Sequence, residues 1–198
     1  MIRFVTRLAM AGIFSSMCVT ASFAGSPTAD AMATAPTKGI RAEILWQLTD
    51  LEKKFEDLAA AMPADKYSWR PMEGVRSVSE VYTHIIGANY LFMSFLNIKP
   101  PMKMDPAMEK NVTDKDAIAK MFKPSFDHVR TAVIGLSDKD LEKTTKMFGS
   151  PATYRAVLLA EIGHLHEHLG QSIAYARMNN VVPPWTAAEQ AAAKKDTK

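Results

Sequence analysis

The chain has 198 residues, a single cysteine, 47% hydrophobic residues and a formal net charge of +3. This length fits one domain that is large enough to bury a core without disulfides. The charge is small and dispersed, with no cluster of Lys and Arg, so the composition argues against a protein that binds nucleic acid.

The N-terminal segment has the features of a secretory signal peptide. Arg3 and Arg7 precede an apolar stretch, Leu8 to Val19, and the small residues Ser22 and Ala24 occupy positions −3 and −1 of a cleavage site. The apolar stretch is too short for a good membrane span. We therefore predict export to the periplasm or secretion, with no stable membrane span after cleavage. The alternative is an uncleaved N-terminal anchor.

Cleavage after residue 24 would change the chemistry open to the mature protein. Residues 1–24 include Cys18, so the mature chain would lack thiols and could form neither disulfides nor Cys-ligated metal sites. Residues 25–38 are rich in Ala, Thr, Pro and Ser, a composition typical of a disordered spacer.

Two helices are predicted in the first half of the mature chain. Apolar residues at spacings of three and four predict a helix from Gly39 to Met62, which Pro63 ends. Ser77 and Glu80 form a capping-box pattern at the start of a second helix that runs to about Asn97. Its apolar stripe comprises Val78, Val81, His84 or Ile85, Ala88, Phe92 and Phe95, which places His84 on the inward face.

The second half predicts two more helices. Residues 99–112 contain three prolines and are expected to be a loop that crosses one end of a bundle. A third helix is expected from Thr113 or Asp114 to about Leu136, kinked or broken at Pro124.

The last long segment predicts the fourth helix. Residues 144–150 are expected to be loop, and Ser150 followed by Pro151 is a favourable start for a helix that runs to about Asn179. Residues 186–198 have little to bury and are predicted to be a frayed tail. No segment predicts a strand. The fold class is therefore all-α, with a four-helix bundle over residues 39–185.

Three of the five histidines lie within five residues. On a helix, His164 and His168 share a face, whereas His166 points away from it. With the inward-facing His84, they could form a three-histidine metal site that leaves a fourth position open, as in catalytic zinc centres. An all-imidazole set favours Zn, Ni or Cu. The alternative is that each is an ordinary polar or half-buried side chain.

A second metal hypothesis comes from the same segment. His164 to His168 also matches the inverted zincin pattern H-x-x-E-H, in which Glu167 would be the general base. Glu189 is the one carboxylate downstream that could serve as third ligand, so this hypothesis is the weaker one. His128, on the third predicted helix, has no obvious partner and is expected at the surface.

Several other residues are candidates for the surroundings of the metal. Gln171 and Tyr175 follow His168 at helical spacing and are expected to line the same groove. Glu80 precedes His84 by one turn and would either orient it or serve only in the capping box. Asn89 and Tyr90 would reach the cavity edge or serve in helix packing.

Three segments together resemble those of the DinB-like (damage-inducible) family. The segments are Trp69-Arg70-Pro71 through Gly74-Val75-Arg76-Ser77-Val78, Glu80 through Tyr90, and His164-x-x-x-His168-Leu169-Gly170-Gln171 with the following residues up to Trp185. Members are four-helix-bundle metalloproteins related to bacterial thiol-dependent transferases. The resemblance implies a triad of His84, His164 and His168, a divalent metal ion (commonly zinc or nickel) and frequent homodimers.

The sequence leaves two functions open. One is an exported metal-dependent hydrolase or transferase that acts on an unknown small molecule through the open coordination position. The other is a non-catalytic metal-binding or interaction bundle. Export departs from the mostly cytosolic family, and it argues against use of the thiols that require a reducing compartment.

Overall fold

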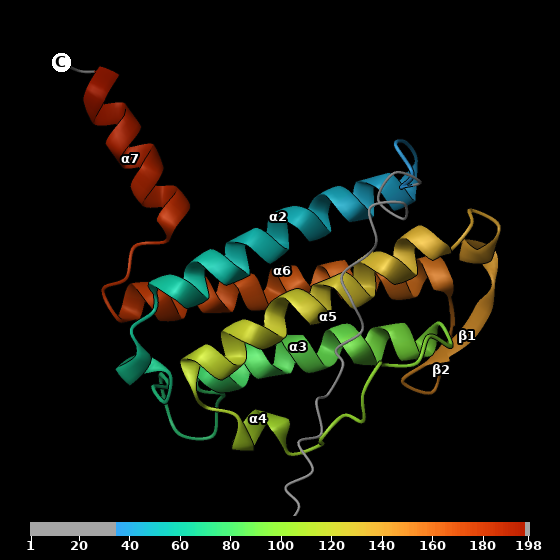
Figure 1. The fold of residues 1–198 in the computed structure, drawn as a ribbon, viewed down its shortest axis with the longest axis horizontal. Helices are drawn as coiled ribbons and strands as arrows, with labels where there is room; N and C mark the ends of the chain where they lie inside the picture. Colours follow the sequence, from blue (N-terminus) through green and yellow to red (C-terminus); the bar gives the residue numbers. More distant parts are fainter. Residues whose placement is uncertain (1–34, 197–198) are drawn as a thin grey trace, which may run out of the picture.

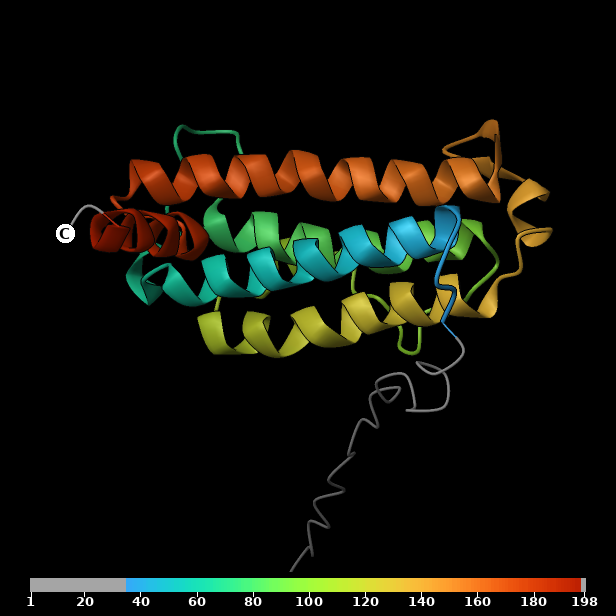
Figure 2. The same ribbon diagram turned by 90° about the horizontal axis from the view of Figure 1, so that it is seen from above.

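The computed structural model describes residues 35–196, in which four long helices form a bundle (Figures 1 and 2). These helices are α2 (Ile40–Ala61), α3 (Val78–Phe95), α5 (Lys115–Gly135) and α6 (Tyr154–Met178). Helices α2 and α3 each pack against both α5 and α6, so α2 and α3 occupy opposite corners. The predicted all-α bundle is confirmed. The signal-peptide prediction and most of the spacer prediction lie outside the described residues.

The path of the chain differs from a simple up-and-down bundle. The colours in Figure 1 show that α3 and α5 run in the same direction and that α2 and α6 run in the opposite one. The connection from α3 to α5 therefore returns along the length of the bundle, and it carries the short helix α4 (Met108–Asn111), which packs on α3. The prediction that this connection crosses one end is wrong, because two parallel neighbours require a full-length return.

The core is built from the apolar stripes of the four helices. Phe55 on α2 packs against Phe122 and Phe126 on α5, with ring centroids 6.2 Å apart in both pairs. All six buried residues of α2 recur at helical spacing: Ile44, Leu48, Leu51, Phe55, Leu58 and Ala59. The predicted stripe of the first helix is thus the face that is buried.

The predicted starts of two helices are confirmed at the level of hydrogen bonds. Ser77 caps α3, its hydroxyl accepting from the backbone N–H of Glu80 at 3.3 Å while its own N–H donates to the Glu80 carboxylate at 2.7 Å. Asp114 caps α5 by accepting from the N–H of Ala117 at 2.8 Å. Helix α5 continues through Pro124, so the helix is not broken there.

A β-hairpin occupies the segment that was expected to be loop and helix start. Strand β1 (Thr144–Met147) pairs antiparallel with β2 (Ser150–Thr153). The two turn residues, Phe148 and Gly149, have φ of +50° and +84°, as two-residue hairpin turns require. Ser150 therefore lies in a strand, and Thr153 caps α6 instead by accepting from the N–H of Ala156.

The segment after the bundle is also ordered. Residues expected to fray form helix α7 (Pro184–Asp196), which projects beyond the bundle in Figure 1 and contacts α2. Trp185 is half-buried, and Lys54 Nζ lies 5.9 Å from its ring centroid. The alanine-rich sequence has high helix propensity, which outweighs its scarcity of core residues. Short 3₁₀ turns, Ala64–Lys66 and Asp140–Glu142, complete the connections.

None of the helices among residues 35–196 is both long enough and apolar enough to span a membrane.

Candidate metal centre

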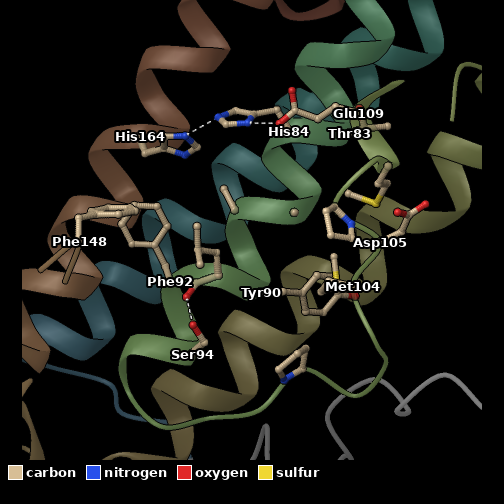
Figure 3. A pocket seen from close by; sticks show the side chains of 16 residues that line it. Thr83, His84, Tyr90, Phe92, Ser94, Met104, Asp105, Glu109, Phe148 and His164 are labelled. Carbon is tan, nitrogen blue, oxygen red and sulfur yellow. Dashed lines mark hydrogen bonds and ion pairs between the residues drawn. The ribbon is translucent and has the colours of Figure 1, made fainter. Parts of the chain in front are cut away.

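Three histidine side chains from two helices converge inside the bundle. His84 comes from α3, and His164 and His168 lie one turn apart on α6. One ring nitrogen of each lies within 4.8 Å of the other two, and this cluster could hold a metal ion. The ring centroids are 4.5 to 5.1 Å apart. Figure 3 shows His84 and His164 facing each other across the gap between α3 and α6.

The spacing of the ring nitrogens suits a small metal ion. Nε2 of His84 lies 3.1 Å from Nε2 of His164. Two nitrogens bound to tetrahedral Zn²⁺ at about 2.0–2.1 Å would be separated by about 3.3 Å. This pair could therefore bind a metal ion after a shift of a few tenths of an ångström, whereas the full set, spread over up to 4.8 Å, would have to draw closer together.

His84 is oriented by a carboxylate from the crossover connection. Glu109, on α4, accepts from His84 Nδ1 at 2.7 Å through one oxygen and from Arg76 Nε at 2.9 Å through the other. Partial burial raises the pKa of Glu109, but hydrogen bonds from Arg76 and His84 outweigh it and keep the pKa below its ordinary value. With its Nδ1 proton engaged, His84 presents the lone pair of Nε2 to the site.

Sequence reasoning missed Glu109 as the partner of His84. It lies 25 residues downstream, and the two are brought together by the return path of the crossover. On the same face, Gly87 leaves room for the neighbouring Met108, since a Cβ at Gly87 would lie 3.3 Å from its terminal methyl carbon. No local pattern marks Glu109 as a site residue.

His168 is oriented by a chain of hydrogen bonds along its own helix. Its Nδ1 donates to the side-chain oxygen of Gln171 at 2.8 Å. The Gln171 amide donates to the Tyr175 hydroxyl at 3.0 Å, which in turn donates to the Arg76 carbonyl at 3.1 Å. Gln171 and Tyr175 thus lie beside the histidines, where the sequence placed them. Because these hydrogen bonds engage Nδ1 of His168, its Nε2 can face the other two rings.

Burial keeps two of the imidazoles neutral. Burial lowers the pKa of His164 to about 4, with further contributions from the neighbouring His168 and His84. Burial also lowers the pKa of His84, although the bond to Glu109 opposes the change. Neutral imidazole is the form that binds metals. Among the described residues, Nδ1 of His164 is buried without a hydrogen-bond partner. The donor set therefore fits a divalent ion.

Glu80 does not orient His84. Its carboxylate belongs to the capping box and also pairs with Lys110 at 2.7 Å and Arg70 at 3.2 Å. Burial raises its pKa, but these hydrogen bonds and charges together lower the pKa to about 2. Of the two roles considered for Glu80, only the capping role agrees with the structure.

Asn89 and Tyr90, which follow each other on α3, lie in different surroundings. Asn89 is buried between α3 and α5, where its amide donates to the Ser125 hydroxyl at 3.0 Å, so of the two roles left open for it the structure agrees with helix packing and not with the cavity edge. Tyr90 does line a cavity beside the histidines. Its ring centroid lies 5.1 Å from that of His128, which is half-buried and not at the surface as expected.

The positions of His166 and Glu189 bear on the inverted zincin hypothesis. His166 is exposed and points away from the cluster, with Nε2 3.0 Å from the side-chain oxygen of Gln47 on α2. Glu189 lies on α7, outside the bundle. Within residues 35–196, the group of potential ligands that comes together is His84, His164 and His168, so the structure gives no support to the inverted zincin arrangement.

One buried acid near the centre was not anticipated. Glu161 lies on α6 one turn before His164 and is 1% exposed. Among the described residues, neither of its carboxylate oxygens has a hydrogen-bond partner. Burial raises its pKa to about 8, so the side chain is largely protonated at neutral pH.

Two hollows have Glu109 in their walls. The first, of about 520 Å³, has His84 and His164 in its wall and is otherwise mostly apolar. The second, of about 550 Å³, is polar. It is lined by Arg70, Gly74, Val75, Arg76, Glu109, Lys110 and Gln171.

Fold and site together define a four-helix bundle with a three-histidine cluster that could hold a metal ion. Residues 47–172 match the model of the DinB superfamily, and since this is more than half of the chain, the protein belongs to that superfamily. The uncharacterized protein YjoA of Bacillus subtilis (strain 168) is 26% identical over 125 residues, covering 61% of this chain and 79% of YjoA.

Solved structures show the same fold. A DinB-like protein from Bacillus cereus ATCC 10987 superposes with a TM-score of 0.63 at 21% identity, over 71% of this chain and 93% of the other. A conserved protein from Enterococcus faecalis gives 0.61 at 16% identity, over 71% and 96%. The crystal structure of YjoA gives 0.53 at 24% identity, over 70% and 92%.

Proposed function

We propose that the protein binds one divalent metal ion, Zn or Ni, through His84, His164 and His168, and that it acts as an exported metal-dependent hydrolase or transferase on a small molecule. The observation that carries the proposal is the convergence of three ring nitrogens within 4.8 Å. Two of these rings are oriented through Nδ1 by separate partners, Glu109 and Gln171. Such outer hydrogen bonds are typical of metal-ligating histidines.

The donor set also supports an open position. Three protein ligands are the number found in catalytic zinc centres, whereas structural centres use four. When bound, the ion would supply Lewis-acid chemistry that lowers the pKa of a coordinated water or other donor group. His84 and His164 face the 520 Å³ cavity, so a small molecule there would lie next to the open position. Glu109 and Arg76 would keep His84 in place during the reaction.

Metal content by plasma mass spectrometry tests the binding. The mature chain from Gly25 is purified without a His tag, beside His84→Ala, His168→Ala and, as control, His166→Ala, whose side chain points away from the cluster. We expect about one ion per parent chain and per His166→Ala chain, and loss in the other two variants. An empty parent after incubation with Zn²⁺ and Ni²⁺ would contradict the proposal.

A non-catalytic metal-binding bundle is the second candidate. The observation in its favour is that both oxygens of Glu109 are already engaged by His84 and Arg76, which leaves that carboxylate no free role in proton transfer. Turnover assays on metal-loaded protein with panels of ester, amide and group-transfer substrates distinguish the two candidates. Activity that disappears with the metal would support the enzyme.

Export and dimerisation belong to the same proposal and rest on the sequence. Export is tested by fractionating cells that express the whole chain and sequencing the N-terminus of the product, which should begin near Gly25. A homodimer is consistent with the apolar side chain of Trp46 on α2, which is 73% exposed. Light scattering on the purified chain would decide between monomer and dimer.

A further inference from the structure

The size and the lining residues of the cavity beside the histidines indicate which kind of ligand it could bind. Its volume of about 520 Å³ lies in the range of about 300–1,000 Å³ that small-molecule sites occupy. Helix α3, the crossover connection and the tip of the hairpin form the wall, and two of the three histidines complete it (Figure 3). Any ligand in this space therefore meets the face of the metal centre formed by His84 and His164.

Most polar side chains of this wall, apart from the Tyr90 hydroxyl, are already engaged within the protein. The Thr83 hydroxyl donates to the Ser79 carbonyl at 2.9 Å, and the Ser94 hydroxyl donates to the Leu91 carbonyl at 2.6 Å. The Glu109 carboxylate is held by His84 and Arg76, as described above. Burial raises the pKa of Tyr90, so its phenol stays neutral. Apart from the two histidines and the exposed Asp105, the wall offers a ligand mainly apolar contacts.

A row of aromatic rings leads from the surface to the centre. Phe148, at the hairpin tip, is 68% exposed and lies 6.0 Å, centroid to centroid, from Phe92. Phe92 lies 5.5 Å from the ring of His164. The hairpin turn holds Phe148 at this position, and its exposed ring lies in the wall of the cavity, where a bound ligand would contact it.

The second hollow differs from the cavity in the charge of its lining residues. It contains Arg70, Arg76 and Lys110, and it lacks all three histidines of the cluster. Glu109 lines both hollows, and its ion-pair partner Arg76 lines the second. A strongly anionic body would be better accommodated among these cations than in the apolar cavity next to the histidines.

We propose that the substrate is a small molecule with an apolar, aromatic or alkyl body and one metal-binding group at its end. The body fills the cavity between α3, the crossover and Phe148, and the donor reaches the ion between His84 and His164. This inference rests on the proposed function, since the donor group requires the metal. The apolar body is an independent part of it, because the wall is present with or without the ion.

The test compares two probes that differ only in their apolar body. Acetohydroxamate and phenylacetohydroxamate carry the same chelating group, and their affinities for metal-loaded protein are measured by titration calorimetry. The cavity variant is Leu91→Asp, which places a carboxylate in the wall. The matched control is Leu159→Asp on α6. The two leucines are 46% and 47% exposed, and only Leu91 lines this cavity.

We expect the phenyl group to strengthen binding by about tenfold or more in the parent chain, as burial of a ring of this size implies. Leu91→Asp should lose most of this gain and Leu159→Asp should keep it, with equal metal content in all three chains. Equal affinity of the two probes for the metal-loaded parent would overturn the proposal. A phenyl gain that survives unchanged in Leu91→Asp would also overturn the assigned cavity.

The metal content shows whether a negative result comes from failure of metal binding or from failure of the apolar site. If the parent chain holds no ion, the proposed function fails, and the apolar body is then tested with toluene, which has no donor group. A rise in melting temperature in the parent and in Leu159→Asp, but not in Leu91→Asp, would support the apolar site. No rise in any chain would overturn it.

Discussion

At the scale of single residues, the three histidines differ in whether a hydrogen bond at Nδ1 orients the ring. His84 and His168 each donate through Nδ1 to a side chain, Glu109 in one case and Gln171 in the other. Nδ1 of His164 has no such partner among the described residues. His164 is therefore positioned through Nε2, which lies within hydrogen-bond distance of His84 Nε2 at 3.1 Å, and by its contact with the ring of Phe92. Of the two oriented ligands, only His84 has a carboxylate as its partner.

Replacing Glu109 should weaken metal binding more than removal of an ordinary surface acid. We expect Glu109→Ala to lower metal affinity by about 10- to 100-fold, because His84 loses the acceptor that fixes its ring and raises its basicity. The affinity is measured by competition with a chromophoric chelator. Glu167→Ala is the control, since Glu167 is exposed on α6 between two of the ligands. Equal affinities of the two variants would contradict the role given to Glu109.

The buried carboxyl of Glu161 should make stability depend on pH. Its pKa is about 8 in the folded chain against an ordinary value of 4.5, so between these values the folded state binds more protons than the unfolded state. The free energy of unfolding should therefore fall as the pH rises from about 5 to 8. The contribution to the metal-free protein is on the order of a few kcal/mol.

Glu161→Gln removes this titration. In urea unfolding of the metal-free chains at pH 5.5 and pH 8, the variant should lose less stability on going to pH 8 than the parent does. Glu167→Gln, which alters an exposed acid, should behave like the parent. The buried His164 contributes with the opposite sign, because its pKa is lowered to about 4 and the unfolded state binds more protons below about pH 6.5. Identical pH dependence of Glu161→Gln and the parent would refute the assignment.

At the scale of elements, local sequence determines where several helices begin. Ser77 and Asp114 cap α3 and α5 through side-chain oxygens, and both starts could be predicted because capping depends on a few adjacent residues. The hairpin and the start of α6 were mispredicted. Ser150 and Pro151 favour a helix start locally, but the turn at Phe148 and Gly149 pairs them with β1.

Removing the cap of α3 should destabilise the whole bundle. We expect Ser77→Ala to lower the free energy of unfolding by about 1 kcal/mol, because the N–H of Glu80 loses its acceptor. In a chain of this size that corresponds to a fall in melting temperature of about 2–4 °C. Ser77→Thr keeps a neutral hydroxyl acceptor and should retain most of the stability. A variant Ser77→Ala as stable as the parent would show that the cap contributes nothing.

At the scale of the whole molecule, the centre joins helices that are far apart in sequence. His84 on α3 and His164 on α6 are 80 residues apart, and the crossover adds Glu109 from a third segment. Helices α3 and α6 also pack directly against each other. An ion bound there would connect two sides of the bundle in a chain whose described part contains no cysteine.

The metal should therefore raise the stability of the folded chain. At a free ion concentration 100 times the dissociation constant, the expected gain in free energy of unfolding is about 2.7 kcal/mol. Differential scanning calorimetry of the mature chain should show a higher melting temperature with Zn²⁺ or Ni²⁺ than with a chelator. His84→Ala should show no such difference. A parent chain that melts at one temperature under all these conditions would argue against a site in the folded state.

The four long helices and two of their caps could be predicted from the sequence alone, because both depend on spacings of three and four residues along one segment. The sequence also placed His164, His168, Gln171 and Tyr175 beside one another, since all four lie on α6. The sequence further indicated that His84 is on an inward face. These features follow from helix geometry alone.

The side chains that complete the site could not be predicted from the sequence, because they come together only when the helices pack. The parallel arrangement of α3 and α5 requires the long return that brings Glu109 to His84, whereas Glu80, one turn from His84, is used in its own cap. The buried state of Glu161 and the apolar cavity beside the histidines likewise depend on how the helices pack. Such contacts join residues 25 to 80 positions apart. Local periodicity carries no information about them, because the relative placement of helices is set by the packing of the whole core.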